Sequence, residues 1–478
     1  MYHKKGYQVE TYNMPIKFGT DGWRAVIADE YTFDNVRRIS AATAEAFKNH
    51  PKLSNGIVIG YDTRFLSKEF AECSAAVFGS TGIKVYLTSS FVTTPTVSLI
   101  TREKELAYGV MITSSHNPAK YNGYKLKDEF GGSMGTELLQ KVEIVLNFNK
   151  EINFSIEPLE DCIQKRTVEY IDGKDYYINN LNKKIDIAVI KSSGIKIVYD
   201  AMYGSGQGML DPLINITSIR SEINPSFGDS SPEPVEKNLQ LITGEMKKNH
   251  YDIGIVTDGD ADRIAILDEK GNFINAQETF ALLLNYLVED KKMTGGVVRG
   301  FSSSQLIEEI CKAHNLKLYT VKIGFKYISE LMVKQDILIG AEESGGIGIK
   351  NHLPERDGIF NGLLFCEMLA VKKKRLSELI EEIESKYGRF YYKRIDKALL
   401  DNSMKVDLLQ KANEINEVAG IRVVKKENMD GCKLFFENGW LLIRASGTEP
   451  LLRLYTETYN IDNTEKILKD ILTKFSLK

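Results

Sequence analysis

Short apolar runs alternate with segments of helical periodicity in the first part of this 478-residue chain. Buried strands are predicted at residues 56–61 and 83–87, amphipathic helices at 68–78 and 93–102, and a further strand at 106–112. Apolar runs of about four to eight residues that alternate with helices are typical of parallel sheets. The pattern therefore predicts a doubly wound α/β layer.

The alternation restarts twice along the chain and then changes its order. A second α/β unit begins near residue 195 and a third near residue 272, whereas the segment after about residue 388 has an α+β order. A chain of this length is too long for one hydrophobic core. We therefore predict four domains, at residues 1–170, 171–271, 272–387 and 388–478, of which the last is the smallest.

The charge balance excludes several classes of partner. The chain has 62 basic and 65 acidic residues, so no excess of positive charge attracts nucleic acid or an anionic membrane. No apolar run approaches the ~20 residues that span a bilayer, and residues 1–13 lack the apolar core of a signal peptide. Five scattered cysteines without a CxxC pair indicate a reducing compartment. We expect a soluble cytoplasmic protein, either a monomer or a homodimer.

The polar segment 113–125 follows the apolar run 106–112 and is predicted to be a loop at a strand's carboxyl end. In α/β sheets this edge usually carries the ligand site. Ser115 is there a candidate nucleophile or phosphate carrier, although an ordinary turn has the same composition. Because Ser115 and His116 are adjacent, we expect their side chains to diverge rather than to form a nucleophile–base pair.

Asp258, Asp260 and Asp262 alternate over five residues between two apolar runs. Carboxylates this close repel one another unless a hard cation neutralises them, so the triplet predicts an Mg²⁺ site. An EF-hand is excluded because Arg263 stands where that loop needs glycine. A solvated acidic turn is the alternative. The cation of Arg263 beside such a metal suits an anionic ligand such as phosphate.

Three further loops have the composition of ligand sites. The segment 444–448, Arg-Ala-Ser-Gly-Thr, combines a guanidinium, hydroxyls and a glycine, as phosphate cradles do, although it is also typical of a plain turn. Glu342 and Ser344 suit sugar hydroxyls or a helix cap. Lys326 suits either the binding of an anion or an exposed position on the protein surface. The glycine run at 204–208 does not have the spacing of a dinucleotide site.

Together with the segment Phe-Gly-Thr-Asp-Gly-Trp-Arg at 18–24, these motifs resemble the α-D-phosphohexomutase superfamily over nearly the whole chain. The resemblance implies four domains around a central cleft: three related α/β units with mixed sheets and a smaller C-terminal α+β domain. It also implies an enzyme that moves a phosphoryl group between O1 and O6 of a hexose phosphate. The reaction would pass through a phosphoserine and a bisphosphorylated sugar such as glucose 1,6-bisphosphate.

The resemblance assigns roles by position. Ser115 would carry the phosphoryl group, and Mg²⁺ would be held by a phosphoserine oxygen of Ser115 together with Asp258, Asp260 and Asp262. Arg24 and His116 would stabilise the phosphoryl group during transfer, and Lys125 would be a general acid or base. The sugar hydroxyls would be bound by Glu342 and Ser344, and the cleft would be lined by Arg263, Gly324 and Lys326. The distal phosphate would be bound by Arg444, Ser446, Gly447 and Thr448.

The motifs favour one substrate among several. Some phosphomannomutase and phosphoglucosamine mutase relatives carry Glu-x-Ser-Gly-His, where this chain has Gly346 in the histidine's place. Its Glu-Glu-Ser pattern and the segment 351–357 look more like phosphoglucomutases, so interconversion of glucose 1-phosphate and glucose 6-phosphate is the leading hypothesis. Phosphomannomutase and phosphoglucosamine mutase are alternatives, as are a metal-dependent sugar phosphatase and a non-catalytic sugar-phosphate-binding protein. The second acid or base is unassigned, with His352 and Arg356 as candidates.

Overall fold

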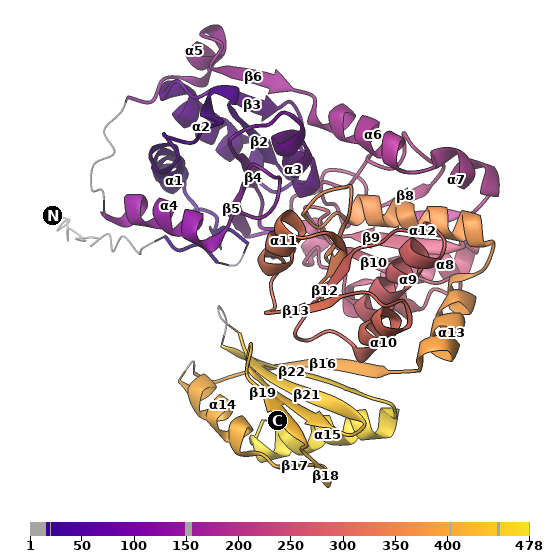
Figure 1. Ribbon diagram of the computed structural model, residues 1–478. Coiled ribbons are helices and arrows are strands. Elements are labelled where there is room, and N and C mark those ends of the chain that lie inside the picture. The colour runs from indigo at the N-terminus through magenta and orange to yellow at the C-terminus, as the bar shows by residue number, and fades with distance from the viewer. Residues whose placement is uncertain (1–15, 20, 149–154, 402, 447–449, 478) are drawn as a thin grey trace, which may run out of the picture.

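A computed structural model describes residues 16–19, 21–148, 155–401, 403–446 and 450–477. The chain forms three α/β domains in succession and a C-terminal domain built on a separate sheet (Figure 1). None of the described helices is both long and apolar enough to cross a membrane.

The first domain contains a six-stranded sheet of order β1-β5-β4-β2-β3-β6, in which β5 is antiparallel to both of its neighbours and the other pairs are parallel. Its strands are β1 (Trp23–Val26), β2 (Ile57–Tyr61), β3 (Val85–Thr88), β4 (Gly109–Ile112), β5 (Tyr121–Lys127) and β6 (Val168–Ile171). Its helices are α1 (Phe33–Ala46), η1 (Leu53–Asn55), α2 (Ser67–Ser80), α3 (Thr94–Glu103), α4 (Thr136–Phe148) and α5 (Leu159–Gln164).

Helices cover both faces of this sheet because consecutive residues of its central strands are all apolar. Ile57 and Ile59 pack into the core beneath α1, α2 and α4, whereas Val58 packs on the opposite face with Val97 of α3. Strands β2, β3 and β4 run parallel, so their carboxyl ends lie at one edge of the sheet, which is where the loop after β4 lies.

The prediction that 113–125 is one loop is wrong in its second half, because residues Tyr121–Lys127 form β5. This strand pairs with β1 on one side and β4 on the other and is almost completely buried. Lysines are more typical of exposed loops than of buried strands, but Lys125 and Lys127 are both buried and paired with carboxylates. Lys125 is therefore held on a rigid strand rather than on a loop.

The second domain contains a five-stranded mixed sheet of order β11-β10-β9-β7-β8. Its strands are β7 (Ile197–Asp200), β8 (Thr217–Ile219), β9 (Ile253–Thr257), β10 (Ile264–Leu267) and β11 (Phe273–Ile274). The helices before and within it are α6 (Gly173–Lys184), α7 (Ile187–Ser193), η2 (Phe227–Asp229), η3 (Glu236–Asn238) and α8 (Gln240–Asn249). The aspartate triplet lies in the turn between the antiparallel strands β9 and β10.

The third domain contains a four-stranded mixed sheet of order β13-β12-β14-β15. Its strands are β12 (Gly296–Gly300), β13 (Leu318–Val321), β14 (Ile337–Ala341) and β15 (Ile347–Ile349). Its helices are α9 (Ala276–Glu289), α10 (Gln305–Ala313), α11 (Phe325–Lys334), α12 (Gly358–Lys372) and α13 (Leu376–Tyr387). Helix α12 packs on β9 and β10, so the second and third domains share one hydrophobic core.

The C-terminal domain contains an antiparallel sheet of order β16-β22-β21-β20-β19 and a small two-stranded sheet. Its strands are β16 (Tyr391–Ala398), β17 (Glu417–Val418), β18 (Ile421–Arg422), β19 (Lys425–Glu427), β20 (Cys432–Phe436), β21 (Gly439–Ala445) and β22 (Leu451–Thr458). Its helices are α14 (Met404–Glu414) and α15 (Ile461–Lys474). The predicted fold class, three α/β domains with mixed sheets and an α+β domain, is confirmed.

Candidate active site

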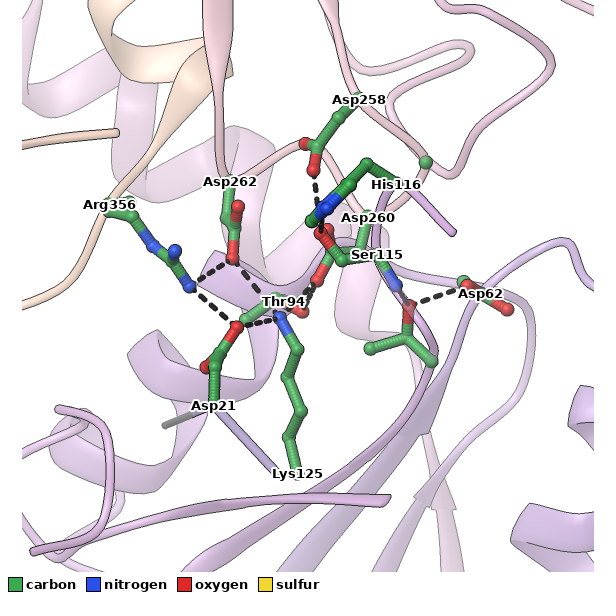
Figure 2. Close-up of polar contacts among 12 residues, drawn as sticks. Asp21, Asp62, Thr94, Ser115, His116, Lys125, Asp258, Asp260, Asp262 and Arg356 are labelled. Atoms are coloured by element: carbon green, nitrogen blue, oxygen red, sulfur yellow. Dashed lines mark hydrogen bonds and ion pairs between the residues drawn. The ribbon is translucent and has the colours of Figure 1, made fainter. Parts of the chain in front are cut away.

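Ser115 is completely buried just beyond β4 and faces the aspartate triplet of the second domain. Its hydroxyl donates a 2.8 Å hydrogen bond to Oδ2 of Asp258 (Figure 2). Its Oγ also lies 3.2 Å from Nδ1 of His116, so the prediction that these two side chains diverge is wrong. The reason is the left-handed backbone of Ser115, with φ of 51°, which strains a non-glycine residue and redirects its side chain.

A buried arginine that was not among the predicted site residues maintains this strained turn. Arg64 donates to the carbonyl oxygens of Ser115 at 2.5 Å and of Asn117 at 2.7 Å. Asp62 accepts a hydrogen bond from the Arg64 guanidinium at 3.1 Å and another from the hydroxyl of Thr113. The same Thr113 hydroxyl oxygen accepts a hydrogen bond from the backbone N–H of Ser115. The sequence signal was an Asp-Thr-Arg segment directly after the buried strand β2, at the same sheet edge as Ser115.

The three aspartates converge as predicted, with one carboxylate oxygen from each within 4.8 Å of the others. All three are completely buried. Oδ1 of Asp260 and Oδ1 of Asp262 have no hydrogen-bond partner among the described residues. Burial, followed by the neighbouring charges of Asp260 and Asp262, raises the pKa of Asp258 well above its usual range. Unpartnered, mutually repelling carboxylate oxygens are the ligands that a hard divalent cation requires, so the residues fit Mg²⁺.

Lys125 reaches this triplet from β5. Its Nζ lies 2.8 Å from Asp260, 3.2 Å from Asp262 and 2.8 Å from Asp21 (Figure 2). Burial acts to lower the pKa of Lys125, but these carboxylates outweigh it and raise that pKa above its ordinary value. Lys125 is therefore an ammonium in this arrangement, which makes it a hydrogen-bond donor and a charge partner of the triplet.

Asp21 and Arg356 complete the charged cluster, and Asp21 was not among the predicted site residues. Arg356 donates to Asp262 at 2.6 Å and to Asp21 at 2.9 Å. Burial acts to raise the pKa of Asp21, but Lys125 and Arg356 hold it well below its usual range. Asp21 thus links the first domain to a loop of the third, and the signal for it was its place in the 18–24 segment.

Arg24 and His116 lie beside this cluster. Arg24 donates to Oδ1 of Asn117 at 2.7 Å and lies 3.4 Å from Asp21. Burial, followed by the positive charges of Arg263 and Arg24, lowers the pKa of His116 well below its usual value. The imidazole is therefore neutral at physiological pH and presents one donor and one acceptor nitrogen.

Of the two candidates for a second acid or base, only Arg356 joins the cluster. His352 is buried elsewhere, with Nε2 bound to Asp357 at 2.6 Å and Nδ1 3.4 Å from Lys184. Tyr177 donates to the same Asp357 at 2.6 Å. Both ring nitrogens of His352 thus take part in the polar contacts between α6 and the start of α12.

The loop 342–346 lies against the cluster from the third domain. Glu342 is buried, with Oε2 3.5 Å from a guanidinium nitrogen of Arg356. Burial raises the pKa of Glu342 to about 7, although Arg356 opposes this shift. The carbonyl of Gly345 accepts the amide of Ile264 at 3.0 Å, which joins the loop to β10. Ser344 is half-buried in the same turn.

The remaining predicted ligand residues lie in the second, third and C-terminal domains. Arg444, on β21, lies 3.0 Å from Asp430, which also accepts the amide of Ile323 at 2.9 Å. That amide is next to Gly324, and Lys326 on α11 bonds Thr136 at 3.2 Å. The carbonyl of Ser446 accepts a bond from Lys405 at 2.7 Å. Arg263, mostly buried, lies 4.0 Å from Asp262, and Gly447 and Thr448 lie outside the described residues.

Known families and proteins resemble the chain over almost its full length. Four models of phosphoglucomutase/phosphomannomutase match: α/β/α domain I at residues 15–152, domain II at 175–271, domain III at 275–387 and the C-terminal domain at 403–474. A phosphoglucomutase/phosphomannomutase of Thermococcus kodakarensis is 29% identical over 95% of this chain and 96% of its own. A phosphoglucosamine mutase of Caldanaerobacter subterraneus is 30% identical over 95% and 97%.

Solved structures show the same similarity. A Thermus thermophilus protein described as a phosphomannomutase has a TM-score of 0.85 and 30% identity, covering 97% of this chain and 99% of its own. An N-acetylphosphoglucosamine mutase of Aspergillus fumigatus, solved with GlcNAc-6P and magnesium, shares the fold at a TM-score of 0.58 and 17% identity, over 98% and 96% of the two chains.

The fold and the site define an enzyme of the intramolecular phosphotransferase class. The chain belongs to the phosphoglucomutase/phosphomannomutase family, the phosphohexomutases. The predicted family and enzyme class are therefore confirmed. The names of the relatives refer to different hexose phosphates, so they do not identify one substrate.

Proposed function

We propose that this phosphohexomutase is a cytoplasmic phosphoglucomutase that interconverts glucose 1-phosphate and glucose 6-phosphate through a phosphorylated Ser115. One observation carries the proposal. The buried hydroxyl of Ser115 points at Asp258 from 2.8 Å, at the edge of a carboxylate group whose oxygens fit a divalent cation. A serine that carries phosphate beside such a group has the charge partner that phosphoryl transfer requires.

Asp258, Asp260 and Asp262 would hold Mg²⁺, which when bound neutralises negative charge on the phosphoryl group. A hexose-phosphate hydroxyl attacks the phosphorus on Ser115, so that a new P–O bond forms as the bond to Oγ breaks. The proton that the attacking hydroxyl loses is balanced by the proton that Oγ gains. The sugar is then a bisphosphate, and its other phosphoryl group returns to Oγ after the sugar has turned over. Glucose 1,6-bisphosphate is in this scheme both the intermediate and the activator that phosphorylates the free enzyme.

The chain's own charged groups would steady this transfer. The Lys125 ammonium and the Arg24 guanidinium offer positive charge to the equatorial oxygens, and the neutral His116 offers one hydrogen bond. Lys125 is the candidate proton donor to the leaving oxygen. Asp21 positions Lys125 and Arg356 through the two ion pairs described above.

The non-reacting phosphate would be held by the C-terminal domain. Arg444, Ser446, Gly447 and Thr448 are the proposed cradle, and Arg263, Gly324 and Lys326 the surrounding lining. Glu342 and Ser344 would bind sugar hydroxyls. A fixed cradle opposite a fixed serine lets the two ends of one sugar exchange places, because binding energy at the distal phosphate positions the reacting hydroxyl.

The surroundings of Gly346 favour glucose phosphate over the alternatives. A Cβ on residue 346 would overlap Cδ of Arg356 and lie 2.8 Å from its Cγ. The aliphatic part of Arg356 thus fills the space that a larger residue at 346 would need, such as the histidine of some phosphomannomutase and phosphoglucosamine mutase relatives. A phosphomannomutase is the second candidate, because one of the similar proteins carries both names.

A coupled assay tests the proposal. Glucose 1-phosphate, mannose 1-phosphate and glucosamine 1-phosphate are supplied in turn with Mg²⁺ and glucose 1,6-bisphosphate, and 6-phosphate product and inorganic phosphate are both measured. We expect the highest kcat/KM with glucose 1-phosphate and no stoichiometric release of phosphate. Faster turnover of mannose 1-phosphate would overturn the substrate assignment, and phosphate in place of isomer would identify a phosphatase.

A further inference from the structure

Two adjacent glutamates of the loop 342–346 contact different parts of the molecule. Glu342 faces Arg356, which bridges the first and second domains. Glu343 faces the C-terminal domain instead. The backbone of the loop is meanwhile bound to the second domain, through the Ile264–Gly345 bond and a bridge between Arg263 and Gly346. All four domains therefore contact this short loop directly or through one side chain.

The carboxylate of Glu343 is almost fully buried, with 6% of the side chain exposed. Ser302 of its own domain donates to Oε2 at 3.0 Å. Tyr455 of β22 donates to Oε1 at 3.3 Å, and a guanidinium nitrogen of Arg394 on β16 lies 4.0 Å from the same oxygen. A desolvated carboxylate depends on such donors, so Glu343 needs the C-terminal domain in its docked position.

The C-terminal partners of Glu343 belong to the surface by which that domain docks. Tyr455 is completely buried in an apolar cluster with Phe301 of the third domain and Trp440 and Leu442 of β21. Leu442 is the register partner of Tyr455, and Arg444 follows two residues later on the same strand. The proposed distal-phosphate arginine thus lies on β21, the strand paired with the β22 strand that contacts Glu343 through Tyr455.

We propose that Glu343 is a positioning residue, which couples docking of the C-terminal domain to the placement of Glu342 and Ser344. In the docked state Tyr455 and Arg394 hold Glu343, and the backbone on either side of Glu343 places the two neighbouring side chains. The substrate-related part of this inference rests on the proposed function, because it takes Glu342 and Ser344 as the sugar contacts. The coupling of the loop 342–346 to the C-terminal domain does not rest on the proposed function.

Three variants and one control separate this role from general support of the interface. Glu343→Gln removes the charge, Tyr455→Phe removes only the donated hydroxyl, and the double variant tests whether the two act together. Glu457→Gln is the matched control, since Glu457 also crosses the interface, accepting the amide of Gln305 at 2.7 Å, but does not touch the loop. Thermal unfolding of each variant verifies that it is folded.

In steady-state kinetics we expect Glu343→Gln and Tyr455→Phe to lower kcat about tenfold, the effect of losing one hydrogen bond to a charged group, with KM changed much less. Preference for glucose 1-phosphate over its 4-epimer, galactose 1-phosphate, should fall in both. The double variant should be no worse than the worse single one. Glu457→Gln should retain the wild-type preference between the epimers.

Amide hydrogen exchange gives a readout that needs no activity. Residues 342–346 should exchange faster in Glu343→Gln and Tyr455→Phe, and at the wild-type rate in Glu457→Gln. Unchanged exchange in the first two, or equal acceleration in all three, would overturn the inference even if the enzyme isomerises glucose phosphate. The expected exchange pattern in a protein without mutase activity would uphold the coupling and refute the proposed function.

Discussion

The hydroxyl of Ser115 donates a hydrogen bond to Asp258, a residue 143 positions further along the chain, across the boundary between the first and second domains. Both residues are completely buried. Under the proposed function this contact places the serine beside the carboxylates that would hold the cation.

Ser115→Ala should reduce mutase activity by roughly a thousandfold or more, because the covalent carrier of the phosphoryl group is lost. Ser114→Ala is the matched control. Ser114 is equally buried, and its hydroxyl has no hydrogen-bond partner among the described residues, so its removal should leave turnover and stability nearly unchanged. Full turnover by Ser115→Ala, measured in the coupled assay, would refute the phosphoserine mechanism.

Mg²⁺ should stabilise the folded protein because it binds the native aspartate triplet and not the unfolded chain. At a concentration a hundredfold above Kd the gain is about 2.7 kcal/mol, seen as a higher Tm, and EDTA should abolish both the gain and the turnover. Asp258→Asn should raise the Tm of the metal-free protein, since one of three repelling buried charges is removed, and should eliminate the response to Mg²⁺. An unchanged response in this variant would place the metal elsewhere.

Gly346→Ala should lower kcat roughly tenfold to a hundredfold, because the new Cβ displaces Arg356 from Asp262 and Asp21. Gly346→His should do the same without creating a mannose-specific enzyme, since Arg356 fills the histidine's space. Gly244→Ala serves as control: it lies within α8 with open space around its Cβ position, and alanine there favours the helix. Wild-type kcat in Gly346→Ala would show that Arg356 has no role in turnover.

Lys433 should make the free energy of unfolding depend on pH. It is buried among the rings of Phe301, Phe435 and Trp440 and donates to the carbonyl of Phe301 at 2.8 Å. Burial, followed by the charge of Arg299, lowers the pKa of Lys433 to about 7. Between pH 7 and about 10.5 the unfolded chain then binds more protons than the folded one, so the free energy of unfolding rises with pH, by roughly 1 kcal/mol per unit.

Lys433→Met should remove this slope and stabilise the protein most below pH 7. The fluorescence of Trp440 reports the transition when the chain's second tryptophan, Trp23, is replaced by phenylalanine. Lys425→Met, a change at an exposed lysine on the neighbouring strand, should leave the slope intact. A variant Lys433→Met with the wild-type slope would show that the lysine stays charged in the folded protein, as its contact with the Trp440 ring favours.

Local patterns were sufficient to predict much of this fold and site. Apolar runs of strand length located β2, β9 and β10, because strands covered by helices on both faces are apolar without interruption. The aspartate triplet was predictable because three carboxylates in five residues repel one another in any conformation. Ser115 was predictable because it follows such a strand at its carboxyl end.

Other features depend on contacts between residues far apart in the chain. The strand β5 contains two lysines and an asparagine and was not predicted, yet it is buried because carboxylates of other domains neutralise its charges: Asp260 for Lys125 and Glu355 for Lys127. The contact between Ser115 and His116 depends on a left-handed backbone that Arg64 stabilises from another loop. The Asp-Thr-Arg segment at 62–64 does not by itself indicate that Arg64 reaches the carbonyl oxygen of Ser115.

The sequence by itself determined most of the elements that form and which residue types carry the chemistry, because periodicity, burial of apolar runs and charge repulsion act over a few residues. The tertiary structure alone decided that Lys125, Asp21 and Arg356 meet at the aspartate triplet, and that Glu343 faces the C-terminal domain. The physical reason is that a buried charge is stable only beside its counter-charge, and the chain brings those charges together only when its domains are packed.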